Sequence, residues 1–127
     1  MRPIFATIDL NALRYNLAVA RKHLGLATQL QAVVKANAYG HGLARVRPAL
    51  DEADGLAVIE LEKALELRTD LGWRKEIAVL EGFYDFDEIA QFQSHGISAM
   101  IHTREQIEML ERVSSGAPIK EIGRAHV

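Results

Sequence analysis

The residue best suited to chemistry in this chain is a lysine that ends an apolar run and precedes a glycine-rich turn. Residues 32–34 form the apolar run, Lys35 ends it, and the turn extends to Gly42. A lysine amine partly withdrawn from water can form a Schiff base with an aldehyde cofactor. An isolated strand-end lysine is more often a surface residue, but a lysine at the mouth of a strand is also poorly placed for packing and well placed for chemistry.

The turn after Lys35 holds further residues of interest. Tyr39 offers a rigid apolar wall and one hydroxyl donor, which suits a planar, phosphorylated ring, although a turn tyrosine can also simply cover apolar surface. Gly40 and Gly42 are expected to adopt backbone angles that other residues avoid. We expect Asn37 to hold the turn through side-chain to backbone hydrogen bonds rather than to act in catalysis.

Four further polar residues lie near the ends of predicted strands. His41, His102 and Glu60 lie near the ends of predicted strands, and imidazole and carboxylate groups are common zinc ligands. No two of them are close in sequence with ligand spacing, so we expect no metal site, a turn role for His41 and a helix start at His102. Glu81 either orients a neighbour in an active-site mouth or belongs to a packing and turn segment, and the second alternative is favoured.

The segments that must position these residues alternate between strand and helix. The chain begins with a predicted strand over residues 5–10 and a helix that Asp9 or Asn11 can cap and Gly25 can end. Further strands are predicted at 30–36, 56–59, 77–80 and 98–101, with helices after Gly42 and at 62–71, 85–92 and 103–113, and Pro118 opens a fifth strand. Such alternation predicts a parallel sheet that is buried on both faces.

The short, regular spacing of these units favours a barrel. Four to five βα units are about half of a (β/α)8 barrel. The predicted fold class is therefore α/β, specifically the truncated N-terminal part of a (β/α)8 TIM-type barrel. Thr103 and Gln106 have the spacing of a capping box at the last helix. A half barrel leaves two strand edges without partners, so we expect it to be poorly stable or to pair with another chain.

The last six residues, IGRAHV, do not continue the strand predicted from Pro118. One set of codons that would encode them, ATC GGA AGA GCA CAC GTC, resembles a common sequencing-adapter sequence. We therefore expect native sequence to stop near Lys120. Residues 1–120 are then a partial barrel domain and residues 121–127 a non-native tail, the alternative being a natural C-terminal loop.

Composition excludes several classes of protein. The chain has 127 residues, a net charge of -2 and scattered positive charges, so no nucleic-acid partner is expected. No apolar run approaches the roughly 20 residues of a membrane helix, so no membrane partner is expected either. The absence of cysteine excludes disulfides and thiolate metal sites and fits a cytoplasmic location.

The run VVKANAYGHG at residues 33–42 closely resembles the pyridoxal-phosphate attachment site of alanine racemases. The segments IDLNALRYNL, DGLAVIELEKALELR and VLEGF are also similar to that family. The chain thus resembles an N-terminal fragment of an alanine racemase from about Phe5 to Lys120.

This resemblance implies a pyridoxal-phosphate-dependent isomerase that interconverts L-alanine and D-alanine, for peptidoglycan synthesis or for alanine catabolism. Lys35 would carry pyridoxal 5'-phosphate as a Schiff base and act as one catalytic base, and the hydroxyl of Tyr39 would approach the cofactor phosphate. The family is a homodimer of subunits with a barrel and a C-terminal β-domain. Its second base, a tyrosine of the partner's β-domain, is not in this chain, so we expect weak cofactor binding and no racemisation by the fragment alone.

Three other functions are compatible with the sequence. The first is a non-catalytic pyridoxal-phosphate-binding barrel protein, which shares a strand-end lysine but usually lacks the NAYGHG run. The second is a structural fragment that acts only as one half of an oligomer through its unpaired strand edges. The third is a racemase of another small amino acid, because the residues that set substrate size lie largely outside the chain.

Overall fold

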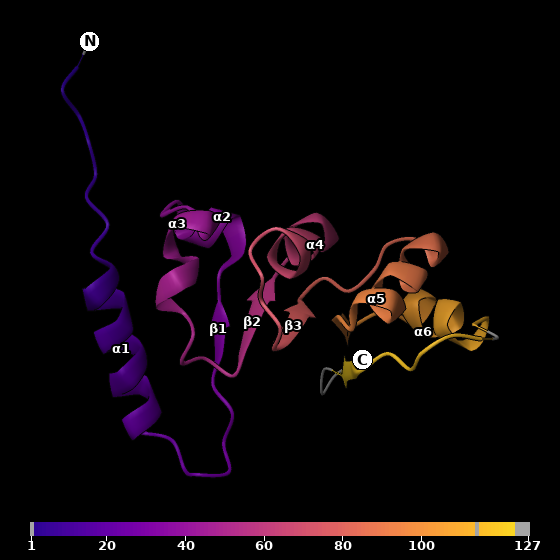
Figure 1. The fold of residues 1–127 in the computed structure, drawn as a ribbon. Coiled ribbons are helices and arrows are strands. Elements are labelled where there is room, and N and C mark those ends of the chain that lie inside the picture. The colour runs from indigo at the N-terminus through magenta and orange to yellow at the C-terminus, as the bar shows by residue number, and fades with distance from the viewer. Residues whose placement is uncertain (1, 114, 124–127) are drawn as a thin grey trace.

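Five parallel strands form one sheet in the computed structural model, which describes residues 2–113 and 115–123 (Figure 1). The strands pair in chain order, β1-β2-β3-β4-β5. They are β1 Gln31–Val33, β2 Gly55–Val58, β3 Glu76–Val79, β4 Ser98–Ile101 and β5 Glu121–Gly123. The helices are α1 Leu10–Lys22, α2 Lys35–Tyr39, α3 Leu43–Val46, α4 Leu61–Thr69, α5 Ile89–His95 and α6 Arg104–Glu111, with 3-10 turns η1 Arg47–Ala49 and η2 Phe86–Glu88. This order confirms the α/β class.

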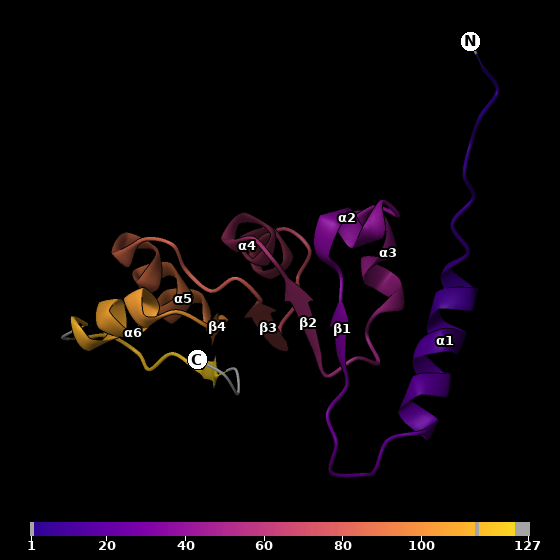
Figure 2. The same ribbon diagram turned by 180° about the vertical axis from the view of Figure 1, so that it is seen from behind.

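The centre of the sheet is the most buried part of the fold. All four residues of β2 are buried, and β2 pairs with β3 over four positions, from Gly55 opposite Glu76 to Val58 opposite Val79. Figures 1 and 2 show α1 at the β1 end of the row of strands and α5 and α6 at the other end. None of the helices that the structure describes is long and apolar enough to cross a bilayer.

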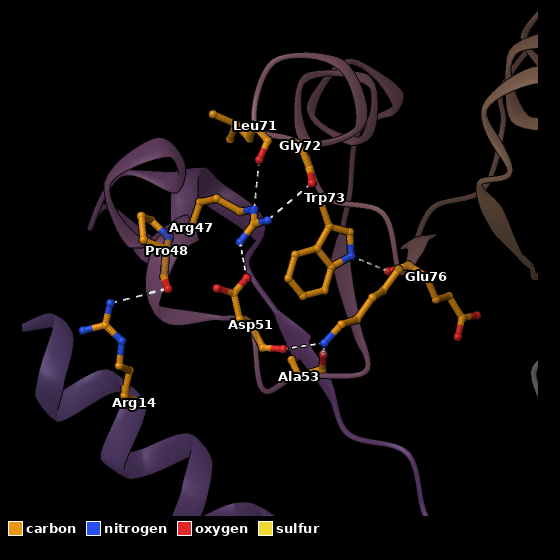
Figure 3. Close-up of polar contacts among 10 residues, drawn as sticks. Arg14, Arg47, Pro48, Asp51, Ala53, Leu71, Gly72, Trp73 and Glu76 are labelled. Atoms are coloured by element: carbon orange, nitrogen blue, oxygen red, sulfur yellow. Dashed lines mark hydrogen bonds and ion pairs between the residues drawn. The ribbon is translucent and has the colours of Figure 1, made fainter.

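The single tryptophan packs at the amino end of the sheet, just before β3. Trp73 is 1% exposed, and its Nε1 donates a hydrogen bond to the backbone carbonyl of Glu76 at 3.0 Å (Figure 3). The guanidinium of Arg47 lies 4.8 Å and the amine of Lys75 5.4 Å from the ring centroid. Arg47 also pairs with Asp51 at 2.6 Å. These contacts join the segment before β3 to the segment before β2.

Two predicted helix starts are confirmed. Asp9 caps α1, because its carboxylate accepts hydrogen bonds from the backbone N–H groups of Asn11 and Ala12 at 2.9 and 3.1 Å. Thr103 and Gln106 form the predicted capping box at α6. The end of α1 differs slightly from prediction, since the helix stops at Lys22 and not next to Gly25.

The predicted first strand, residues 5–10, is wrong. Residues 2–9 form no strand. They extend from the start of α1 at Leu10 away from the sheet (Figures 1 and 2). Ile4 and Phe5 are 77% and 85% exposed. Apolar alternation predicts one buried face, but a strand also needs a neighbour for its N–H and C=O groups. No strand of the described residues lies beside this segment.

The fifth strand lies three residues later than predicted. It spans Glu121–Gly123 and pairs with β4, with Ala99 opposite Glu121 and Ile101 opposite Gly123. The first residues of the expected tail therefore continue the sheet, contrary to prediction, because pairing with β4 decides where the strand begins. Residues 124–127 lie outside the described residues, and whether residues 121–127 are native stays a prediction.

Candidate functional site

Lys35 lies at the carboxyl end of β1, as predicted. The preceding residue, Val34, still donates its N–H to the carbonyl of Ala57 in β2 at 2.9 Å. Lys35 is half-buried and lines a hollow of about 190 Å³ together with Glu60 and Lys63. Among the described residues its amine has no hydrogen bond or ion pair. The carboxyl ends of barrel strands are where barrel enzymes place catalytic groups.

The second amine of this hollow is already engaged. Lys63 pairs with Glu66 at 2.9 Å. The hydrogen bond that Lys63 donates to Glu66, and then the charge of Glu66, raise the pKa of Lys63, and the charge of Glu60 adds a smaller effect in the same direction. The amine of Lys63 is therefore engaged by an ion pair with Glu66. The amine available for chemistry in this hollow is that of Lys35.

The backbone after Lys35 forms a left-handed turn. Ala36, Asn37, Ala38 and Tyr39 all have positive φ, between 51° and 56°. Such a conformation costs most L-residues roughly 1–2 kcal/mol each and costs an asparagine less, so the turn is strained. The positive φ predicted for Gly40 and Gly42 is confirmed at 86° and 92°. The sequence analysis missed the left-handed residues before them, and the glycine-rich pattern was the only local signal.

Hydrogen bonds hold this turn in place. The side-chain oxygen of Asn37 accepts a hydrogen bond from the N–H of Leu43 at 2.9 Å, which confirms the turn-holding role predicted for Asn37. Its backbone carbonyl accepts from the N–H of Gly42, also at 2.9 Å. The Nδ1 of His41 lies 2.9 Å from the carbonyl of Ala38. Because a carbonyl only accepts, this nitrogen carries the proton, and His41 is the turn residue that was predicted.

Tyr39 lines a different hollow. Its side chain is 59% exposed and borders a mostly apolar space of about 430 Å³ between α1 and β1, which His41 and Asp9 also line. Lys35 does not line this space, so the structure places the two predicted site residues at neighbouring hollows on either side of the turn. The predicted roles of Lys35 and Tyr39 stay predictions.

The carboxyl ends of β3 and β4 are joined by a buried glutamine. Gln106 is 4% exposed, and its amide nitrogen donates to the carbonyls of Glu81 and Phe83 at 2.9 and 3.3 Å. Its amide oxygen accepts from the N–H groups of His102 and Thr103 at 2.8 and 3.2 Å. The imidazole of His102 lies 3.9 Å from the Glu81 carboxylate. The capping-box spacing indicated the Thr103 contact, but not the contacts to β3.

The residues weighed as metal ligands lie apart along the sheet. Glu60 follows β2 and lines the hollow of Lys35, His41 belongs to the turn after β1, and His102 follows β4. Within residues 2–113 and 115–123, no group of three histidine, aspartate or glutamate side chains is placed to hold a metal ion.

Comparison with known proteins adds to this geometry. The family described as alanine racemase, N-terminal domain, matches residues 8–121. The chain is 51% identical over 109 residues to alanine racemase of Nitrosomonas europaea, which covers 86% of this chain and 30% of that protein. It is 45% identical to alanine racemase of Nitrosospira multiformis, covering 93% and 32% of the two chains.

Solved structures give the same result. The biosynthetic alanine racemase of Pseudomonas aeruginosa superposes with a TM-score of 0.87 at 41% identity, over 95% of this chain and 34% of that one. Alanine racemase of E. faecalis superposes with a TM-score of 0.80 at 31% identity, over 90% of this chain and 32% of that one. The chain spans about a third of the length of these relatives. The matches confirm the predicted fold, the N-terminal part of a (β/α)8 barrel.

Proposed function

Since this chain belongs to the alanine racemase family through its N-terminal domain, we propose that its parent protein is an isomerase that interconverts L-alanine and D-alanine. One observation of the structure carries the proposal: Lys35 lies at the carboxyl end of β1, and its amine has no partner among the described residues. The names of the relatives support a racemase over a non-catalytic cofactor-binding barrel protein.

The cofactor of this proposal is pyridoxal 5'-phosphate, and the residues present fit it. Lys35 would hold the cofactor aldehyde through its amine, which has no hydrogen-bond or ion-pair partner among the described residues. Tyr39, four residues on, has a side chain that is 59% exposed at the neighbouring hollow, and we propose that its hydroxyl contacts the cofactor phosphate. When bound, the cofactor supplies an electron-withdrawing ring that makes the proton on the substrate Cα removable.

Racemisation requires proton transfer on two faces of the same carbon. The Nζ of Lys35 would take or return the proton of the substrate Cα on one face. The opposite face needs a second group within hydrogen-bond reach. We propose that this group is a tyrosine of the partner subunit in a homodimer of the parent protein, and that the 127-residue chain by itself does not racemise alanine.

The cellular role follows from the product. We propose one of two roles for the parent protein: supply of D-alanine for peptidoglycan synthesis, or catabolism of alanine. A cytoplasmic location fits a chain without cysteine. We keep residues 1–120 as the partial barrel domain and residues 121–127 as a non-native tail in this proposal.

Trapping of the cofactor tests the assignment of Lys35 directly. The chain is incubated with pyridoxal phosphate, reduced with borohydride and digested, and the modified lysine is identified by mass spectrometry. We expect modification of Lys35 well above that of Lys63 and Lys22, and loss of this preference in Lys35→Arg. Equal modification of the three lysines would contradict the assignment.

A further inference from the structure

We propose that Asn37 is a positioning residue for Lys35, because its side chain fastens the left-handed turn to α3 and so fixes where Lys35 leaves the sheet. The proposal rests on the proposed function only in taking Lys35 as the reactive amine. The fastening itself depends on contacts between described residues. No other side chain of the turn makes an equivalent bond to α3.

The turn needs such a fastener because its conformation is unfavourable. Ala36 and Ala38 have φ of 51° and 56°, and an alanine has no polar side chain that favours this region. Asn37 is the residue of the four whose type tolerates positive φ best. A run of strained residues persists only when the surrounding structure determines it.

The fastener connects the turn to the core. Leu43, whose N–H donates to the Asn37 side chain, is the first residue of α3 and is 1% exposed. Val46, one turn later, is 3% exposed. The residue that precedes α3 is Gly42, which makes no side-chain capping bond. Asn37 supplies the missing acceptor from six residues away and thereby connects the turn to the buried residue Leu43 of α3.

Lys35 therefore lies between two anchors. On one side, the N–H of Val34 donates a hydrogen bond to the carbonyl of Ala57 in β2, and the carbonyl of Val34 accepts one from the N–H of Ala38 at 3.0 Å. On the other side, Asn37 is bonded to Leu43, and Asn37 lines the same hollow as Lys35. Removal of the second anchor leaves the backbone that follows Lys35 without its side-chain bond to α3, so that only the hydrogen bonds within the turn hold it. An amine held in one orientation reacts faster than one that must first be ordered.

Three variants separate the effect of the hydrogen bond between Asn37 and Leu43 from the effect of residue type on the positive φ at position 37. Asn37→Ala removes the acceptor and the tolerance of positive φ, Asn37→Gly removes only the acceptor, and Asn37→Asp keeps an acceptor. Far-UV circular dichroism establishes that each variant folds. Should the alanine variant fail to fold, the glycine and aspartate variants decide the question between them.

Two measurements are made on each variant. The first is amide hydrogen exchange at Leu43, which we expect to become about fivefold faster in the alanine and glycine variants, as for loss of one typical hydrogen bond. The second is the ratio of Lys35 to Lys22 modification after borohydride reduction, with formaldehyde and, separately, with pyridoxal phosphate as the aldehyde. We expect the ratio to fall severalfold in the same two variants and to be retained in Asn37→Asp.

The outcomes distinguish this proposal from the proposed function. If exchange at Leu43 rises while the Lys35 ratio is unchanged with both aldehydes, Asn37 is merely structural and the proposal is overturned. A wild-type ratio in Asn37→Gly would overturn it as well. If the wild-type chain shows no preference of pyridoxal phosphate for Lys35, the proposed function fails, while the formaldehyde ratio and the exchange of Leu43 still decide the positioning role.

Discussion

Replacement of Ala36 by glycine is expected to stabilise the fold, although alanine to glycine changes in helices normally destabilise. Ala36 has φ 51° and ψ 50° and an exposed side chain, and its Cβ opposes this left-handed conformation. Glycine adopts the same angles without a steric cost. The substitution leaves the hydrogen bond from the N–H of Gly40 to the carbonyl of residue 36 in place.

The size of the effect follows from two opposing contributions. Relief of the left-handed conformation is worth roughly 1–2 kcal/mol. The greater freedom of glycine in the unfolded chain costs about 0.4–1 kcal/mol. Because Ala36 is exposed, its methyl group contributes little burial. The free energy of unfolding should rise by about 0.8 kcal/mol, which is a shift of about 0.5 M in the urea midpoint for an ordinary denaturant slope.

Urea unfolding followed by the fluorescence of Trp73 measures this shift, since the chain has one tryptophan and it is 1% exposed in the fold. Ala90→Gly is the matched control. Ala90 is also exposed but belongs to the right-handed helix α5, where glycine costs about 0.5–1 kcal/mol. A midpoint that falls in Ala36→Gly as it does in the control would refute the reasoning.

Three further predictions concern other parts of the chain. The hydrogen bond from Arg21 holds the pKa of Asp54 below its ordinary value. The pair therefore stabilises the fold fully at a pH above the ordinary pKa, and this stabilisation is lost as the pH falls through the lower pKa of the folded state. Acid unfolding of Asp54→Asn should show a weaker pH dependence than that of the wild type. Gly82→Ala should lower stability by about 3 kcal/mol or more, because φ is +67° and a Cβ would lie 2.5 Å from a backbone oxygen. Gly72→Ala, with φ +65° and no atom within 4 Å, should cost clearly less in the same urea titration. Resequencing of the gene should show that the codons for residues 121–127 are not native, and a genomic frame that encodes IGRAHV would contradict the adapter interpretation.

The sequence was most informative where a feature depends on near neighbours. The strand predicted at 98–101 has those bounds in the structure. The caps at Asp9 and Thr103 and the bond of the Asn37 side chain to the backbone were also predicted. Capping and turn bonds join residues only a few positions apart, so residue type and spacing suffice to find them.

Predictions failed where a distant part of the chain decides. The alternation in residues 5–10 has the period of a strand, but a strand forms only beside another strand, and the described residues provide none there. The place of β5 at Glu121–Gly123 was fixed by its pairing with β4. The contacts of Gln106 to the end of β3 likewise join residues more than twenty positions apart.

The same division holds for the candidate site. The order of apolar runs placed Lys35 at the carboxyl end of a strand, because a residue that directly follows a strand has little freedom to lie elsewhere. Only the tertiary structure made the turn at 36–39 left-handed and gave Lys35 and Tyr39 separate hollows. The physical reason is that the buried residue Leu43 of α3 holds the strained turn through its hydrogen bond to Asn37, and α1 forms one wall of the hollow at Tyr39.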